Sequence, residues 1–591
     1  MTAIVCFLLP AIFLMFMRYK ILGDKVKCGF CGDVKSFLKE YLIVVLFLNV
    51  VVIAIAYVFF GHDGALDSDL IQNTKFTVRY IMLEIFISII EPIAENVIRF
   101  HFTFKNERKA VKINKNIVLY LYAMVLFFMN FIRIFDNSFW EDEGFSIRLA
   151  KMSIPDMIVA TGDDVHPPLY YLFTQLLYHI LGNHGYTYHL SAIIPYALVI
   201  IIACTIVKKY FGMIPAVVLI TMSSIMKNPV KYNVEARMYS LAALFVLMAF
   251  IEFYKIVEKN SKKNWILFCM MSLGAAYTHY YALISVAFLY LMLLFLVKKN
   301  KKTLKPLCLS YLVTILAYSP WLIILLKSFG RTADSWWLGD IPTIQDCWEF
   351  LFDYMWLSVI FAVCLIFFIL YQLNIVKINS RRTAKFFDRT DLEVKIPKSI
   401  NISNELFLII SGMASVCGTV AVGLVLSYTI RPFFILRYLF PVSAVIYLIF
   451  GICIRNLQWK RVWAVIIIFA ILITNVPQYM ARFNWERKTE TETEAFLKEV
   501  SISSEAMIYT NSRPLDWTLL DYYYPESNHE YVGDWKEKID SKYREIWVLW
   551  TDELDQTTLK SFAKQGYTTN EIYENAFANG IWLHVYKLQR K

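Results

Sequence analysis

Long apolar runs alternate with short polar loops along most of the chain. The runs are about 17 to 25 residues long, as at residues 41–60, 306–326 and 433–454. About 20 apolar residues in a helix cross the hydrocarbon core of a bilayer, and a helix satisfies its own backbone hydrogen bonds there. The pattern predicts a mainly α-helical, polytopic membrane protein.

The overall composition agrees with this interpretation. Of the 591 residues, 58% are hydrophobic and only 18% are charged, whereas soluble proteins have about 25% charged residues. This composition excludes a soluble metabolic enzyme, a nucleic-acid-binding protein and a fibrous protein. The ten cysteines lie mostly within apolar runs and form no disulfide framework.

The charges of the loops predict their sides of the membrane, because Lys and Arg concentrate on the cytoplasmic side. Two acidic loops, 61–78 and 136–165, are expected outside. The basic loops are expected inside, namely 22–40, 105–115, 208–209, 259–263, 298–305, 375–399 and 455–461.

Segment 167–182 could be a span or an interfacial helix. Counting it as a span would place the basic clusters at 208–209 and 259–263 outside. An interfacial helix on the outer face keeps both clusters inside. We therefore expect about 14 spans, with both termini extracytoplasmic, in a multi-pass protein of the plasma membrane.

The expected domains are an N-terminal three-span extension at 1–110, a transmembrane core at 111–480 and a small extracytoplasmic α/β domain at 482–591. The core includes an outer loop and interfacial helix at 136–182. After about residue 482, the apolar runs shrink to strand length. We expect strands at 506–509, 546–550 and 582–588, with helices at 515–522 and 553–564.

The outer loop 136–165 carries the strongest candidate for catalysis. Glu141, Asp142 and Glu143 are consecutive, and a carboxylate held at the bilayer surface could act as a general base. Neighbouring side chains point in different directions, so at most one can reach a given proton. The alternative is a solvated acidic loop with aromatic interface anchors.

Other polar residues near the outer face are candidates for substrate binding. His166 precedes Pro167 at the entrance to the interfacial helix, although a purely structural histidine is an alternative. Lys227, Lys231 and Arg237 are cations in an outer loop, which suggests an anionic ligand such as phosphate or, alternatively, lipid headgroups. The remaining candidates are Glu235, Tyr239, His279, Tyr280, Arg431 and Arg437.

Cys28 and Cys31 resemble half of a zinc site, but no second pair accompanies them. We therefore assign no metal ligands.

Taken together, the motifs WEDEGFSIRLA, DVHPPLYYLF and EARMYSLAALF, followed by THYY and RYLFP, resemble the GT-C superfamily of polytopic membrane glycosyltransferases. The similarity is to the bacterial dolichyl-phosphate-mannose and protein O-mannosyltransferase-like branch, and it covers about residues 116–480.

The resemblance implies an inverting glycosyltransferase that moves a sugar from a polyprenyl-phosphate carrier to an acceptor at the outer face of the membrane. On that pattern Asp142 is the base, cations near Arg237 and Arg437 hold the phosphate, and His166 shapes the site. Choosing Asp142 over Glu143 rests on the family. A divalent metal cofactor stays open, and the expected partners are the lipid-linked sugar, the bilayer and a glycan, lipid or protein acceptor, with no nucleic acid.

A transporter or lipid flippase for a glycolipid or anionic substrate is the alternative function. It predicts ionisable residues at membrane depth on several broken helices, usually with an internal repeat. Here the ionisable residues cluster in outer loops instead.

Overall fold

The computed structural model describes residues 115–135, 139–164, 166–331, 340–381, 389–394, 402–430, 432, 434–457 and 460–500, and 502–590 with gaps at 504, 517–519, 525–526, 533–542, 544 and 579–580. Contacts divide the chain into two units, Met1–Val125 and Leu126–Lys591, and the account below concerns the second. The expectations for 1–110, for Cys28 and Cys31, and for Arg431 lie outside the described residues.

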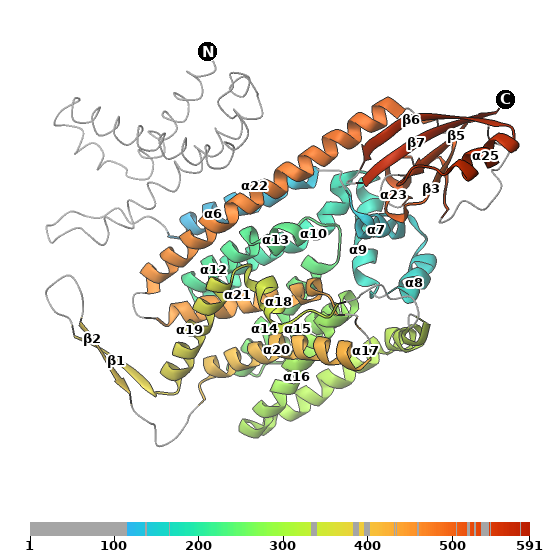
Figure 1. Cartoon of the computed structure of the whole chain (residues 1–591). Helices are drawn as coiled ribbons and strands as arrows, with labels where there is room; N and C mark the ends of the chain where they lie inside the picture. The colour runs from blue at the N-terminus through green and yellow to red at the C-terminus, as the bar shows by residue number, and fades with distance from the viewer. Residues whose placement is uncertain are drawn as a thin grey trace, which may run out of the picture. The chain divides into compact units, whose positions relative to one another are not determined.

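Helices dominate the chain up to residue 500 (Figure 1). The first group of helices is α6 (Lys115–Phe131), α7 (Glu141–Lys151), α8 (Ile154–Asp163), α9 (Leu169–Leu181), α10 (Gly185–Ile202), α11 (Lys208–Phe211), α12 (Met213–Ile225), α13 (Lys227–Tyr232) and α14 (Tyr239–Glu258). The second group is α15 (Lys262–Thr278), α16 (Tyr280–Lys299), α17 (Leu304–Arg331), α18 (Ile344–Phe352), α19 (Met355–Gln372), α20 (Asn404–Thr429), α21 (Phe440–Arg455) and α22 (Lys460–Val500).

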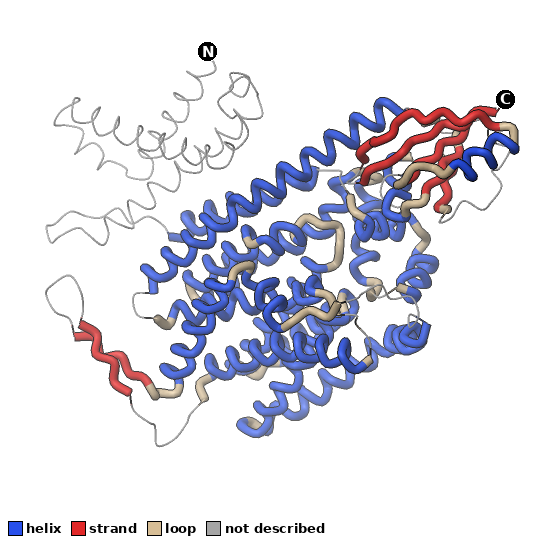
Figure 2. Tube along the Cα trace, in the orientation of Figure 1, coloured by secondary structure: helices blue, strands red, loops and turns tan. Residues whose placement is uncertain are grey.

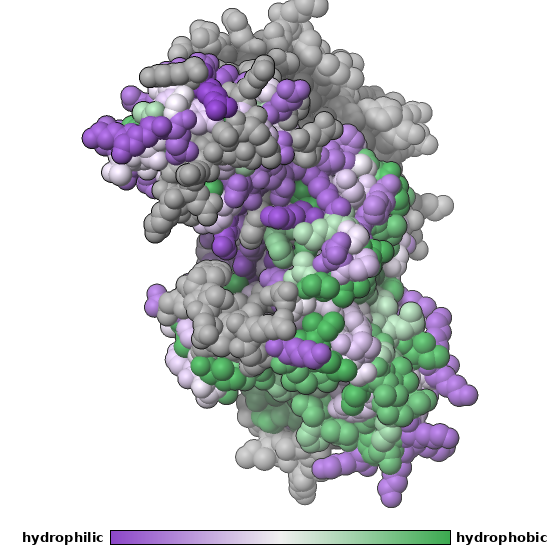
Figure 3. Space-filling view, turned by 90° about the vertical axis from the view of Figure 1, so that its right-hand side faces the viewer, coloured by the Kyte–Doolittle hydropathy of each residue, from purple (hydrophilic) through white to green (hydrophobic). Residues whose placement is uncertain are grey.

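Nine helical segments among the described residues are long and apolar enough to cross a membrane. The mainly helical, multi-pass architecture is therefore confirmed, whereas the count of 14 spans stays a prediction. Helix α9 has 13 residues, fewer than the roughly 20 that cross a bilayer core. On the face shown in Figure 3, hydrophobic residues gather over the lower part and hydrophilic residues around the upper part.

Helix α21 lies at the centre of the bundle, because 94% of the most apolar 18-residue stretch within Leu436–Arg455 is buried. It packs closely against α12 because Gly451 lacks a side chain. A Cβ atom at Gly451 would lie 2.6 Å from the Cα atom of Pro215, a separation at which the backbone would have to move. Small residues allow this close approach between membrane helices.

The C-terminal domain is a five-stranded mixed sheet in the order β4-β3-β5-β7-β6 (Figure 2). Strand β3 pairs parallel with both β4 and β5, whereas β7 pairs antiparallel with β5 and β6. Its elements are β3 (Met507–Thr510), α23 (Arg513–Leu515), α24 (Asp521–Tyr523), β4 (Asn528–Tyr531), β5 (Glu545–Trp550), α25 (Gln556–Lys564), β6 (Tyr567–Ala578) and β7 (Ile581–Arg590).

The small α/β domain is confirmed, and two of its strands, β4 and β6, were not predicted. A further unpredicted element is the hairpin of β1 (Val376–Arg381) and β2 (Arg389–Val394), whose strands pair antiparallel.

Helix α22 joins the membrane bundle to the C-terminal domain without a break. The change in composition near residue 482 falls inside this helix, which continues to Val500 (Figure 1). Phe496 and Val500 are buried in the core of the C-terminal domain with Ile508, Trp547 and Val585. The helix therefore fixes the sheet relative to one end of the bundle.

A buried ion pair fastens α22 to the segment that precedes the outer loop. The Arg133 guanidinium donates from Nε and Nη2 to the two carboxylate oxygens of Glu486, at 2.9 and 2.5 Å. It also donates to the carbonyl oxygen of Val230. The two side chains are 1% and 10% exposed, so neither charge can be solvated if its partner is lost.

We predict that Arg133→Met lowers the stability of the protein by about 3–5 kcal/mol, because it leaves the Glu486 carboxylate buried without its main partner. Thermal unfolding in detergent measures the effect. Lys488→Met on the same α22 is the matched control, since Lys488 is 73% exposed in a surface pair with Glu492 and such pairs contribute about 0–1 kcal/mol. Equal effects of the two changes would contradict this account.

Candidate active site

Glu143 ties the start of α7 to the loop between α13 and α14. Its Oε2 atom accepts the backbone N–H of Trp140 at 3.2 Å, and its Oε1 atom accepts the backbone N–H of Ala236 at 2.7 Å. The residue is only 4% exposed. Both oxygens are thus engaged, so Glu143 positions the loop in this structure and is poorly placed to take a proton from a substrate.

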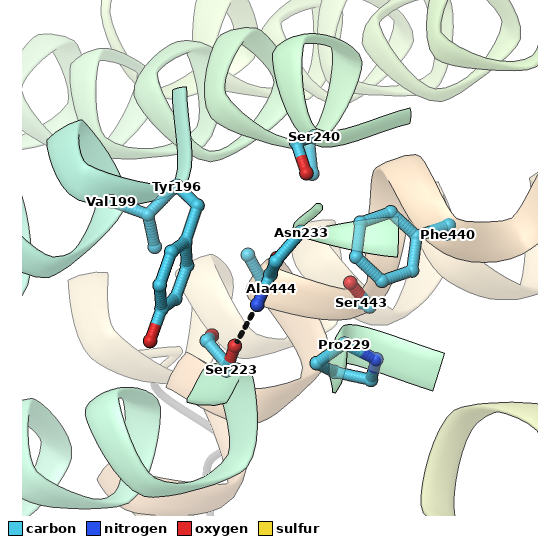
Figure 4. Close-up of a pocket in the computed structure, with 10 residues that line it drawn as sticks. Tyr196, Val199, Ser223, Pro229, Asn233, Ser240, Phe440, Ser443 and Ala444 are labelled. Carbon is cyan, nitrogen blue, oxygen red and sulfur yellow. Dashed lines mark hydrogen bonds between the residues drawn. The ribbon is translucent and has the colours of Figure 1, made fainter. Parts of the chain in front are cut away.

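The loop from Asn233 to Met238 is buried throughout. The Asn233 side chain donates to the carbonyl oxygen of Ser223 at 2.7 Å (Figure 4). Beside it lies a cavity of about 20 Å³ lined in part by Tyr196, Ser240 and Phe440. That volume is enough for about one water molecule, and the buried Ser223 hydroxyl there has no hydrogen-bond partner.

Asp142 is held between two arginines from distant parts of the chain. Its Oδ2 atom lies 2.6 Å from Nη1 of Arg437 and 3.9 Å from Nη2 of Arg237. Arg237 also donates to the backbone carbonyl of Asp142 at 2.9 Å, and to Ser146 Oγ at 3.3 Å. The Asp142 side chain is 24% exposed, and its Oδ1 atom has no hydrogen bond to any described residue, so it can meet a substrate.

His166 and His279 lie together beside the arginines, with ring centroids 5.5 Å apart. His166 Nδ1 lies 3.2 Å from Asp164 Oδ2, and His279 Nδ1 accepts the backbone N–H of Tyr281 at 3.1 Å. Burial lowers the pKa of both histidines, and nearby guanidiniums lower it further. Both rings are therefore neutral at pH 7, and the free Nε2 atom of His279 carries its proton.

Several buried polar atoms around Asp142 have no hydrogen-bond partner among the described residues. A buried donor without a partner costs free energy, so their gathering at one place indicates a site for a ligand. They are Arg237 Nε, Arg437 Nε, the Tyr239 hydroxyl, the Tyr281 hydroxyl, His166 Nε2 and His279 Nε2.

Glu235 adds a buried carboxyl group to this region. Lys231 Nζ lies 3.7 Å from its Oε2 atom, yet neither oxygen accepts a hydrogen bond from a described residue. Burial, partly opposed by Lys231, raises the pKa of Glu235 to about 7. The protonated, uncharged form of Glu235 is therefore well populated near neutral pH. Because this form does not neutralise Arg237 and Arg437, their positive charges stay available to an anion.

The structure brings together most of the candidates that the sequence suggested. Asp142, His166, Arg237, Tyr239, His279 and Arg437 surround one place, from five separate segments of the chain. Tyr280 does not join them, because its hydroxyl accepts the indole N–H of Trp321 at 3.2 Å. Among the described residues, no group of three or more His, Cys, Asp or Glu side chains is arranged to hold a metal ion.

The sequence reasoning missed several neighbours. Tyr438 lies 5.0 Å from both the His279 and Tyr281 rings, and Tyr171 is within 3.4 Å of Arg237. His189 supports Glu143, since its Nδ1 donates to the carbonyl oxygen of Val234 at 2.8 Å and lies 3.7 Å from the Glu143 carboxylate. Tyr171 and Tyr438 lie inside the quoted motifs DVHPPLYYLF and RYLFP, so the motifs pointed to them without showing their roles. His189 lies in an apolar helical run, where no local pattern marks it.

We predict that Glu235 makes stability fall as pH rises from about 5 to about 7. An acid whose pKa is raised by folding binds more protons in the folded state, so its unfavourable contribution grows until pH passes the folded pKa. Comparing the Tm of wild type with that of Glu235→Gln across this range isolates the effect. A Tm difference that stays constant across this pH range would contradict the prediction.

Comparisons with known proteins bear on this arrangement. Residues 165–324 match the family model described as dolichyl-phosphate-mannose-protein mannosyltransferase, a segment that contains His166, Arg237 and His279. No protein of curated function matches the chain.

Two solved structures resemble the fold. They are ArnT from Cupriavidus metallidurans in the apo state, with a TM-score of 0.47, and the same protein bound to undecaprenyl phosphate, with a TM-score of 0.45. Each is 10% identical to this chain, and each alignment covers 80% of this chain and 97% of the other. The match at residues 165–324 to a mannosyltransferase family model agrees with the resemblance to the GT-C superfamily of polytopic membrane glycosyltransferases that the sequence motifs indicated.

Proposed function

We propose that the chain is an inverting glycosyltransferase that takes its sugar from a polyprenyl-phosphate carrier at the outer face of the plasma membrane. The observation that carries the proposal is the gathering of unpartnered donors from Arg237, Arg437, Tyr239 and His279 beside Asp142. The match of residues 165–324 to a mannosyltransferase family supports it. The site would be extracytoplasmic, as would both termini, by the loop charges.

The donor phosphate would bind to the two arginines. Guanidinium groups bind phosphate oxygens through two hydrogen bonds at once, and the Nε atoms of Arg237 and Arg437 are buried without a partner. Arg437 lies at the start of a membrane-spanning segment, Leu436–Arg455. This position suits a lipid phosphate at the interface, with its polyprenyl tail among the helices.

Asp142 would act as the general base. It would take the proton from the acceptor hydroxyl as that oxygen bonds to the anomeric carbon of the sugar, while the bond from that carbon to the phosphate oxygen breaks. The polyprenyl phosphate leaves as a stable anion held by the arginines, so the reaction needs no general acid. This differs from a glycosidase, which uses two carboxyl groups.

We predict that Asp142→Asn lowers transfer by about 10²–10⁴-fold, because an amide keeps the shape but cannot accept the hydroxyl proton. The assay is turnover by purified protein with a lipid-linked sugar. Asp552→Asn, an exposed change in the C-terminal domain, is the matched control.

Glu143→Gln separates the base from its neighbour. It should reduce thermal stability, since the carboxylate of Glu143 accepts two backbone N–H groups. If Glu143→Gln abolishes transfer while Asp142→Asn retains it, Asp142 is not the base.

We further predict that Arg437→Ala weakens binding of polyprenyl phosphate by about tenfold or more, and that Arg437→Lys restores it only in part. A charge-assisted hydrogen bond contributes about 1.5–3 kcal/mol, and an ammonium cannot reproduce the paired geometry of a guanidinium. Equilibrium binding of a fluorescent polyprenyl phosphate measures the effect. Arg482→Ala is the control, since Arg482 pairs with Glu486 away from Asp142. Unchanged affinity in Arg437→Ala would contradict the proposed phosphate site.

A further inference from the structure

A second polar pocket lies where helix α7 meets the C-terminal domain. Figure 1 shows α7 and α23 next to each other beside the sheet. The pocket has a volume of about 410 Å³ and is lined by Arg148, Arg513, Asp516, His529, Glu530 and Tyr531. It is therefore formed by the helix that carries Asp142 together with residues of the C-terminal domain.

One face of α7 makes the contact with the C-terminal domain. Glu141 and Arg148 are two helical turns apart and so share a face, and Glu141 is attracted electrostatically to Arg513. Lys151, one turn further along, donates to the backbone carbonyl of Asp521 at 2.6 Å. The pocket is thus fixed relative to the catalytic end of α7.

The wall of the pocket in the C-terminal domain is held in place by a hydrogen-bonded histidine. His529 Nδ1 lies 2.8 Å from Asp516 Oδ1, and its Nε2 lies 3.5 Å from Asp521 Oδ1. The Arg513 guanidinium lies over the ring of Tyr531, at 5.0 Å from the ring centroid. Two of the acids near the pocket are therefore already paired with a histidine.

The two arginines of the pocket are attracted to carboxylates only at longer range, Arg513 to Glu141 and Arg148 to Asp521. Arg148 and Arg513 are both exposed, and neither forms a hydrogen bond or ion pair with any described residue. Two free guanidiniums in one pocket suit a ligand with a phosphate or carboxylate group. Tyr531 adds an aromatic ring, which can pack against the apolar face of a sugar.

The pocket shares helix α7 with Asp142. Asp142 and Arg148 are six residues apart on α7, which corresponds to a rise of about 9 Å along the helix. That is about the length of one or two sugar rings. Six residues also turn the helix, so the side chains of Asp142 and Arg148 point about 120° apart. A molecule anchored in the pocket by its anionic group would have to extend around α7 to present a hydroxyl to the base.

We propose that this pocket, here called the acceptor pocket, binds the acceptor through a phosphate or carboxylate group on a sugar. This inference rests on the proposed function, because it assigns the second substrate of the same reaction. It gives the C-terminal domain a direct part in choosing the acceptor, through Arg513, His529 and Tyr531.

The test is calorimetric titration of the purified full-length protein with glucose 1-phosphate, glucuronate and methyl glucoside. We expect at least one of the two anionic sugars to bind, and methyl glucoside not to. The double change Arg148→Gln and Arg513→Gln should weaken binding by about tenfold or more, while Lys560→Gln on the exposed face of α25 should leave it unchanged. The single Arg148→Gln serves if the double variant does not fold.

A second double variant, Arg237→Gln and Arg437→Gln, separates the acceptor pocket from the donor site. Binding that persists in it but is lost in the Arg148 and Arg513 variant supports the inference. Binding that is lost only when Arg237 and Arg437 change, or equal binding of methyl glucoside, would overturn it. The assay involves no turnover, so its outcome is independent of whether Asp142→Asn abolishes transfer.

Discussion

The pairing of Asp142 with Arg437 and Arg237 is the interaction on which the rest of the site depends. Burying a guanidinium is costly unless its charge is compensated and its donors are satisfied. Here one carboxylate serves two guanidiniums, at 2.6 and 3.9 Å, and the Nε atoms of both stay without a partner. Both guanidiniums therefore keep a buried donor that no described residue satisfies. An anion such as a phosphate, bound between Arg237 and Arg437, would supply the missing hydrogen-bond acceptors.

The surrounding structure holds Asp142 and Arg237 in fixed positions relative to each other. Glu143 joins the start of α7 to the loop that carries Arg237 through two backbone hydrogen bonds. On the far side, Lys151 ties the end of α7 to the C-terminal domain, while α22 extends from the membrane bundle into the core of that domain. Helix α7 is thus fixed at both ends. This suits a residue that must keep a fixed distance from two substrates.

Much of this could be predicted from the sequence, because bilayer-crossing helices leave a strong local signal and polar residues against that background are conspicuous. Local sequence patterns were misread where the same pattern can arise from more than one structure. The polar residues after 482 predicted the end of the membrane bundle, but helix α22 continues through them to Val500. The sequence motif THYY suggests Tyr280, whereas Tyr281, which points about 100° away on the helix, lies against Tyr438. His189 carries no local signal, and Tyr438 lies inside the motif RYLFP, but only long-range packing shows the role of either residue.

The most direct test of the account is the class of donor that the purified protein uses. Wild-type protein in detergent would be given either a polyprenyl-phosphate sugar or the corresponding nucleotide sugar, with transfer followed by mass spectrometry. The buried arginines beside a membrane-spanning segment predict turnover with the lipid-linked sugar alone, and loss of that turnover in Arg237→Ala. Turnover with the nucleotide sugar in the absence of any lipid-linked sugar would contradict the account.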